Sequence, residues 1–95
     1  MKNYELIYVL KTNIEDDAKT VVLDKVKAII ETSGEVDKVD VWGARRLAYE
    51  IQKLNEGFYV LVNFKASTEI PKELDRNLKI SDSVIRHMII NLDEK

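Results

Sequence analysis

The alternation of strand-like and helix-like apolar periodicity constrains the fold of this chain more than any other feature of its sequence. Two segments repeat apolar residues every three or four positions, as one face of an amphipathic helix does. The other apolar segments run continuously or alternate with polar residues, which is typical of strands. Along the 95 residues, the order is strand, helix, strand, strand, helix, strand.

The first helix is predicted to begin near Asn13 and to end at Thr32 or Ser33. Asn13 is a good N-cap residue, and the acidic residues after it favour the positive end of the helix dipole. Gly34 is well placed as the C-terminal cap. The apolar stripe of this helix consists of Ala18, Val22, Val26, Ile29 and Ile30.

The second helix is predicted to begin at Ser67 or Thr68 and to end near residues 80–82. Pro71 is tolerated there because it falls in the first turn, where its missing N–H costs no helical hydrogen bond. The buried side of this helix repeats every four residues, with Ile70, Leu74 and Leu78.

Strands are predicted at residues 2–10, 36–51, 58–65 and 84–92. The second strand is expected to be interrupted near Gly43, because an isolated glycine in a strand indicates a bulge or a bend. Residues 53–57 are predicted to form the turn of the hairpin that joins the second and third strands. Alternation in the third strand places four core residues on one side: Phe58, Val60, Val62 and Phe64.

This order of elements predicts an α+β fold with a single ferredoxin-like domain over residues 1–95. Right-handed crossovers interleave the two β-α-β halves of the β-α-β-β-α-β chain. The expected result is a four-stranded antiparallel sheet in the order 4-1-3-2, with both helices on one face. The other face of the sheet is then open.

The open face is predicted to carry more aliphatic groups than a hydrated surface needs. If Leu6 and Tyr8 face the helices, the alternation turns Glu5, Ile7 and Val9 outward. The residues that join them are Tyr59, Leu61 and Asn63, with either Arg86, Met88 and Ile90 or Ile85, His87 and Ile89. A contiguous apolar patch usually marks a protein partner, so we expect one here, with basic residues at its rim meeting RNA.

Catalytic and metal chemistry find little support in the sequence. There is no cysteine, so thiolate sites and disulfides are excluded, which suits a cytoplasmic protein. His87 is the only histidine and is expected to pack within the last strand. The acidic residues at 15–17 are explained by the helix dipole. We expect no enzyme activity, cofactor, metal or small-molecule substrate, and no segment is apolar enough to cross a membrane.

The nucleic-acid signal lies in residues 42–53, although the net charge of −2 lacks the usual excess of basic residues. This segment contains Trp42, Arg45, Arg46, Tyr49 and Lys53. Arginine and lysine attract phosphates, and an exposed aromatic ring can stack on a base. The alternative is a solvated strand with ordinary charges. The segment 57–64 is a poor match to the RNA-recognition motif, because Glu56, Tyr59 and Val60 replace its basic, small and stacking residues.

The string from Trp42 to Ile51, WGARRLAYEI, closely resembles the core signature of the bacterial small-subunit ribosomal protein S six family. The match continues through Lys53 and residues 57–60, and through the segments 4–6, 78–80 and 84–89. The resemblance implies a ferredoxin-like fold and a structural role in the small ribosomal subunit. It also implies binding to the central domain of small-subunit ribosomal RNA as a heterodimer with ribosomal protein S eighteen.

A basic partner of this kind would explain how a chain with a net negative charge can bind RNA, because the partner's cations can neutralise much of the phosphate charge. The residues expected to meet RNA or the partner are Lys2, Tyr4, Arg45, Arg46, Lys53 and Arg86. Two rivals share the topology. One is a ferredoxin-like regulatory domain that binds a small molecule between paired subunits. The other is an acyl-phosphate hydrolase, which would need glycines and an arginine that residues 11–14 lack.

Overall fold

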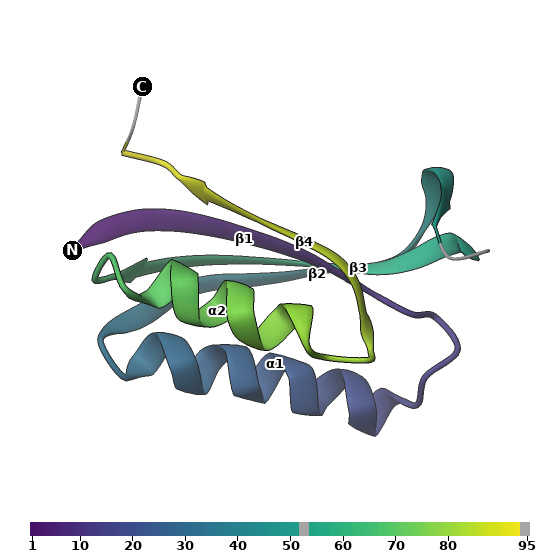
Figure 1. Ribbon diagram of the computed structural model, residues 1–95, viewed down its shortest axis with the longest axis horizontal. Coiled ribbons are helices and arrows are strands. Elements are labelled where there is room, and N and C mark those ends of the chain that lie inside the picture. Colours follow the sequence, from purple (N-terminus) through teal and green to yellow (C-terminus); the bar gives the residue numbers. More distant parts are fainter. Residues whose placement is uncertain (52–53, 94–95) are drawn as a thin grey trace.

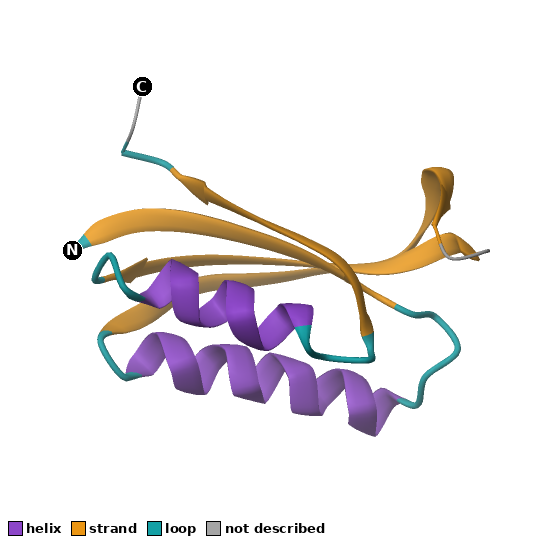
Figure 2. Cartoon of the chain, viewed as in Figure 1, coloured by secondary structure: helices purple, strands orange, loops and turns teal. Residues whose placement is uncertain are grey.

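The computed structural model describes residues 1–51 and 54–93 and contains the predicted order of elements (Figure 1). The elements are β1 (Lys2–Leu10), α1 (Asp16–Glu31), β2 (Gly34–Ile51), β3 (Leu54–Ala66), α2 (Ile70–Lys79) and β4 (Val84–Asn91). The sheet has the order β2-β3-β1-β4, which is the predicted order counted from the other edge. All three strand pairs are antiparallel, and both helices cover one face of the sheet (Figure 2). The ferredoxin-like fold is thus confirmed.

The core lies between this face of the sheet and the two helices. In the β1–β3 pairing, Leu6 lies opposite Val62 and Tyr8 lies opposite Val60, so that both pairs point toward the helices. The helices contribute Val22, Val26, Ile30, Ile70, Leu74 and Leu78, all buried. Burying one such aliphatic side chain is worth about 1.5–3 kcal/mol, which explains why the two apolar stripes fix the orientation of the helices.

The predicted ends of the first helix are wrong at both termini. The helix begins at Asp16, because the N–H groups of Ala18 and Lys19 donate to the carbonyl of Glu15 at 3.1 and 3.2 Å. Gly34 is the first residue of β2 and not a helix cap. A Cβ atom at Gly34 would lie 2.1 Å from the carbonyl oxygen of Lys65. This glycine therefore permits close pairing of two strands.

Other predicted boundaries also differ from those observed: the second strand begins two residues early, the third strand ends one residue late, and the second helix ends at Lys79, one to three residues early. The second helix begins at Ile70, two or three residues later than expected, with Pro71 in its first turn as predicted. Residues 54–57 belong to β3 and not to a turn. Gly57 lies in this strand, where a Cβ atom would come within 2.3 Å of Val9 Cγ1. This close approach explains why the position holds a glycine. The last strand ends at Asn91, one residue early.

The bulge predicted at Gly43 is confirmed. Gly43 has a φ of 83°, in the left-handed region that glycine adopts without steric cost. The pairing of β2 with β3 shifts between Val41 and Gly43, which leaves Trp42 as the extra residue. Beyond this bulge, the far ends of β2 and β3 curl away from the helices, toward the open face of the sheet (Figure 1).

Candidate nucleic-acid and partner interface

The open face of the sheet is formed by alternate residues whose identity follows from the strand pairing. Val9 lies opposite both Tyr59 on β3 and Arg86 on β4, and Ile7 lies opposite Met88. Of the two sets considered for the last strand, the open face therefore carries Arg86, Met88 and Ile90, all of them exposed.

His87 points to the opposite side, toward α2. Its Nε2 atom lies 2.7 Å from Asp75 Oδ1, and its side chain is only 12% exposed. Hydrogen bonds from His87 and Lys79 hold the pKa of Asp75 below its ordinary value. The expectation that His87 is a packed, hydrogen-bonded residue is confirmed, and it ties β4 to the second helix.

An aromatic hollow of about 170 Å³ lies on the open face. It is lined by Ile7, Val9, Trp42, Tyr59, Arg86, His87 and Met88. The rings of Trp42 and Tyr59 are stacked, with centroids 6.1 Å apart and an interplanar angle of 17°. Trp42 Nε1 donates to Asp40 Oδ2 at 3.2 Å, which orients the indole while leaving it 40% exposed. A ring held in this way can stack on a base or receive an apolar side chain.

Two contacts hold the curled end of the hairpin over this face. In the first, the buried side chain of Leu47 lies beside Gly57, and Val9 next to Gly57 is only 3% exposed although it points to the open side. The second is a hydrogen bond. Arg86 Nη1 donates to the hydroxyl of Tyr49 at 3.2 Å, which joins β4 to β2. The hairpin end therefore forms one wall of the interface, and Tyr49 positions a guanidinium at its rim.

The structure places two of the predicted arginines on this face. Arg45 pairs with Gly57, on the same side as Tyr59, and among the described residues its Nη1 atom donates only to the neighbouring carbonyl of Ala44, at 3.3 Å. Arg86 stands across the hollow on β4. Arg46 is exposed but pairs with Glu56, so it points to the other side of the hairpin. Within residues 1–51 and 54–93, none of these guanidinium groups has a carboxylate oxygen within 4.0 Å, so an ion pair there does not compete with a phosphate.

Three predicted site residues lie elsewhere. Lys2 is exposed at the start of β1, at roughly 23 Å along the strand from Val9 if each residue advances about 3.3 Å. Tyr4 is 5% exposed and stacks on Phe64 with centroids 5.4 Å apart. Because its ring is part of the core, Tyr4 is removed from the predicted interface. Lys53 lies outside the described residues.

Sequence reasoning named Tyr49 as an aromatic residue that could stack on a base, but it missed Leu47 and the contact of Tyr49 with Arg86. Placing the extra residue of the bulge at Trp42 puts Gly43 and Arg45 on the same side as Tyr59. The pairing shifts again between Arg46 and Ile51, so alternation alone does not place Leu47 and Tyr49.

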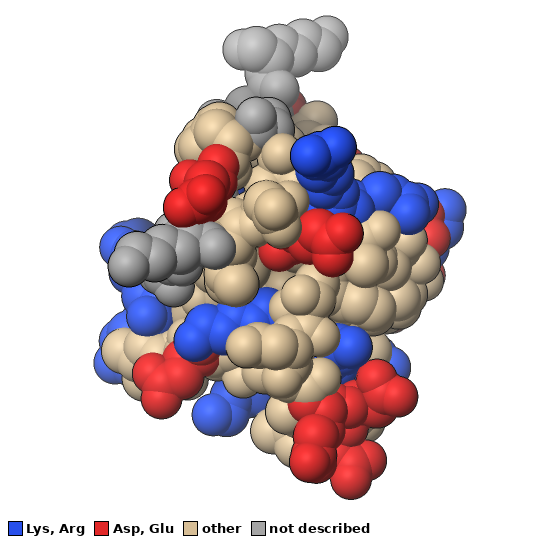
Figure 3. All heavy atoms as spheres, turned by 90° about the vertical axis from the view of Figure 1, so that its right-hand side faces the viewer, with Lys and Arg blue, Asp and Glu red and all other residues tan. Residues whose placement is uncertain are grey.

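Charges of both signs are mixed over the hairpin end of the molecule (Figure 3). Acidic side chains gather at the lower corner, where α1 begins with Glu15, Asp16 and Asp17. Lysine and arginine side chains are spread over this end without forming one continuous patch. The positive potential at this end therefore comes from separated cations and not from one basic patch.

The comparisons with known proteins agree with this geometry. The family model described as "Ribosomal protein S6" matches residues 3–91. The chain belongs to the ribosomal protein S6 family. It is 60% identical to the small ribosomal subunit protein bS6 of Alkaliphilus oremlandii over 94 residues, which cover 99% of this chain and 100% of that protein. It is 57% identical to bS6 of Clostridioides difficile, over 95% of this chain and 98% of that protein.

The fold agrees with a solved structure of the S6 family as well. The crystal structure of the 30S ribosomal protein S6 of Thermotoga maritima superposes with a TM-score of 0.88 at 30% identity. The match covers 95% of this chain and 86% of that one. The S6 family consists of structural ribosomal proteins and not of enzymes, so the predicted family and the predicted lack of catalysis are confirmed.

Residues 1–51 and 54–93 contain neither a helix that could span a membrane nor a metal cluster. No helix in these ranges is long and apolar enough to cross a membrane. No group of three or more histidine, aspartate or glutamate residues in the same ranges could hold a metal ion.

Proposed function

We propose that this chain, acting as a single domain, is a structural constituent of the small ribosomal subunit in the cytoplasm. It binds the central domain of small-subunit ribosomal RNA together with a basic protein partner, ribosomal protein S eighteen. Membership of the S6 family supports the ribosomal role. The RNA and the partner are what the family resemblance implies, and the open face of the sheet supports them.

The observation that carries the proposal is the aromatic hollow with its arginine rim. Met88 and Ile90 are exposed apolar side chains on the same face, where water would favour polar groups. A protein partner that covers them would bring its own cations beside Arg45 and Arg86. The chain has 17 acidic residues against 15 lysines and arginines. A partner that shares the neutralisation of phosphates makes RNA binding compatible with this balance.

The roles of the predicted side chains follow from their positions. Arg86 and Arg45 face phosphates or the partner at the hollow, and Arg46 extends the basic character of the hairpin. Lys53 lies outside the described residues and keeps the role that the sequence predicts for it. Lys2 reaches RNA at the far end of the sheet. None of these contacts needs a chemical step, because the function is to hold RNA and a partner in a fixed relative position.

The experiment measures binding of the full chain to a central-domain RNA fragment, with and without S eighteen, at low and high salt. We expect tight binding only with the partner, and affinity that falls as salt rises because phosphate contacts release counterions. Arg86→Ala should weaken binding about tenfold, the order expected for losing a charge-assisted hydrogen bond. Absence of salt-dependent binding under both conditions would refute the proposal.

Arg76→Ala provides the matched control. Arg76 is an exposed arginine on α2, where its Nη2 atom lies 2.8 Å from Glu73 Oε1. It lies on the helical side of the sheet, so its loss changes the net charge equally while leaving the open face intact. Equal weakening by both substitutions would show that net charge, and not the open face, governs binding.

A further inference from the structure

The aromatic hollow on the open face brings flat side chains from three strands together around one small space. In the sheet, β1 lies between β3 and β4, so Tyr59 and Arg86 stand on either side of Val9. Trp42 stacks on Tyr59 from β2, the strand on the far side of β3. The other side of the Tyr59 ring therefore faces β1, where the hollow and Arg86 lie.

The spacing of the strands leaves room in the hollow for one flat ring. Neighbouring strands lie about 4.8 Å apart and side chains stand nearly perpendicular to the sheet, so two spacings separate Tyr59 from Arg86 by roughly 9.6 Å. Two stacking contacts of about 3.5–4.0 Å each need roughly 7–8 Å. The volume of about 170 Å³ also suits one ring system, since pockets for larger ligands begin at roughly 300 Å³.

Arg86 is held so that its guanidinium can serve as one of the two stacking surfaces. Its Nη1 atom donates to the hydroxyl of Tyr49 at 3.2 Å. A hydrogen bond lies in the plane of a guanidinium, so this contact restricts the group without covering its faces. Among the described residues, no carboxylate oxygen lies within 4.0 Å of Arg86 or Arg45. Asp40, the acidic residue beside the hollow, accepts a hydrogen bond from the indole of Trp42.

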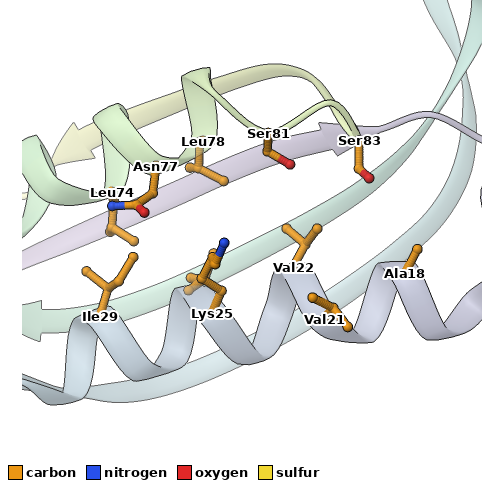
Figure 4. A pocket seen from close by; sticks show the side chains of 11 residues that line it. Ala18, Val21, Val22, Lys25, Ile29, Leu74, Asn77, Leu78, Ser81 and Ser83 are labelled. Atoms are coloured by element: carbon orange, nitrogen blue, oxygen red, sulfur yellow. The ribbon is translucent and has the colours of Figure 1, made fainter.

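The groove between the two helices shows that this combination is particular to the open face. This helical groove is larger, at about 290 Å³, and Figure 4 shows the side chains around it. The described residues that line it are aliphatic or small and polar apart from Lys25, and none of them is aromatic. The helical groove therefore offers no ring on which a base could stack.

We propose that the hollow binds one unpaired base of the RNA, stacked between the ring of Tyr59 and the guanidinium of Arg86. Aromatic rings and arginine planes are the surfaces on which proteins hold unpaired RNA bases. Arg45 pairs with Gly57, two residues along β3 from Tyr59, and stands roughly 7 Å away, within reach of the phosphate of that nucleotide. The inference rests on the proposed function and refines it, because it assigns the hollow to RNA. Ile90, which is exposed outside the hollow, is left to the protein partner.

The first test uses the fluorescence of Trp42, the one tryptophan of the chain. A uridine hexanucleotide is titrated into the full chain at low salt, beside a sugar–phosphate strand of the same length without bases. Both strands carry the same phosphates, so only stacking distinguishes them. The strand with bases should bind about tenfold more tightly and change the emission of Trp42. Equal binding of the two strands, or an unchanged emission with millimolar hexanucleotide, would overturn the proposal.

Methyl chemical shifts locate the bound hexanucleotide on the unmodified chain. The methyl signal of Met88, which lines the hollow, should move on addition of the hexanucleotide. The methyl signals of Leu78, which lines the helical groove, should stay in place. Movement of Leu78 without Met88 would place the strand on the helical side and refute the inference.

Substitutions in the assembly with the central-domain fragment and the partner distinguish a base from an apolar side chain of the partner. Tyr59→Leu keeps an apolar group but removes the flat ring, so it should weaken RNA binding about fivefold or more, whereas Tyr59→Phe should leave it within about twofold. Arg86→Lys keeps the charge but removes the planar group, and should also weaken binding about fivefold. Arg76→Lys makes the same exchange on α2, away from the hollow, and should leave binding unchanged.

Tolerance of both Tyr59→Leu and Arg86→Lys would overturn the proposal, because an aliphatic side chain of the partner would then fill the hollow. Arg86 is exposed, so its substitution gives a result even if Tyr59→Leu fails to fold. If the fragment binds with the expected salt dependence but is insensitive to these substitutions, the proposed function stands and the base site alone fails. If the fragment does not bind at all, the proposed function fails, and the hexanucleotide titration still decides whether the hollow binds a base.

Discussion

Gly57→Ala is the substitution that tests most sharply how the hairpin end is held over the open face. The new Cβ atom would lie 2.3 Å from Val9 Cγ1 and 3.3 Å from Leu47 Cδ2. Val9 is 3% exposed and cannot swing into solvent without losing its packing. Overpacking of this kind costs about 1–3 kcal/mol, so the free energy of unfolding should fall by about that amount.

A double-mutant cycle with Val9→Ala isolates the clash. Val9→Ala alone should also destabilise, by about 1–2.5 kcal/mol, because it removes buried methyl groups. In the double variant, the smaller side chain makes room for the new methyl group. The combined loss should therefore be smaller than the sum of the single losses by about 1–2 kcal/mol.

Urea denaturation followed by the fluorescence of Trp42 measures these free energies, since Trp42 is the one tryptophan of the chain. Equal slopes of the unfolding transitions would show that the variants share the same denatured state. If the two substitutions were additive within about 0.5 kcal/mol, the packing of Val9 against Gly57 would not hold the hairpin end, and the reasoning would fail.

Three further predictions concern single side chains. Tyr49→Phe removes the hydroxyl that positions Arg86 and should weaken binding of the RNA fragment and the partner a few-fold, while thermal unfolding is unchanged. Asp75→Asn should reduce the loss in the free energy of unfolding as the pH falls, measured by urea denaturation at a series of pH values. The pKa of Asp75 is lowered in the fold, so its contribution is present above the ordinary value of 3.8 and is lost as the pH falls through the lower folded value. Tyr8→Phe should raise the free energy of unfolding by about 1 kcal/mol, because within the described residues its buried hydroxyl has no hydrogen-bond partner; a lower value would show that the hydroxyl is satisfied.

The fold could be predicted because its determinants are local. Apolar stripes with a spacing of four residues and strands with a spacing of two each bury one face, and their order leaves few topologies. The same alternation predicted that Ile7 and Val9 would face away from the helices. It also placed Tyr4 with Leu6 and Tyr8, so the burial of Tyr4 could have been foreseen from its own strand.

The misassigned features depend on contacts between distant parts of the chain. Gly34 and Gly57 resemble a helix cap and a turn residue locally, but each makes room for a strand or side chain far along the sequence. The hydrogen bond between Tyr49 and Arg86 joins residues 37 positions apart. It requires the end of the hairpin, beyond the irregularities at Trp42 and after Arg46, to curl over the open face, and no local propensity indicates how far it curls.

Oxidation of side chains by hydroxyl radicals tests most directly the central claim that the open face of the sheet is covered on assembly. The rates are measured on the free chain and on its assembly with RNA and partner. Trp42 and Met88 are 40% and 49% exposed on the open face, whereas Ile80 is 75% exposed beyond the end of α2. We predict that the oxidation rates of Trp42 and Met88 fall several-fold on assembly, while that of Ile80 stays unchanged. Unchanged rates at Trp42 and Met88 in an assembly that has formed would contradict the account.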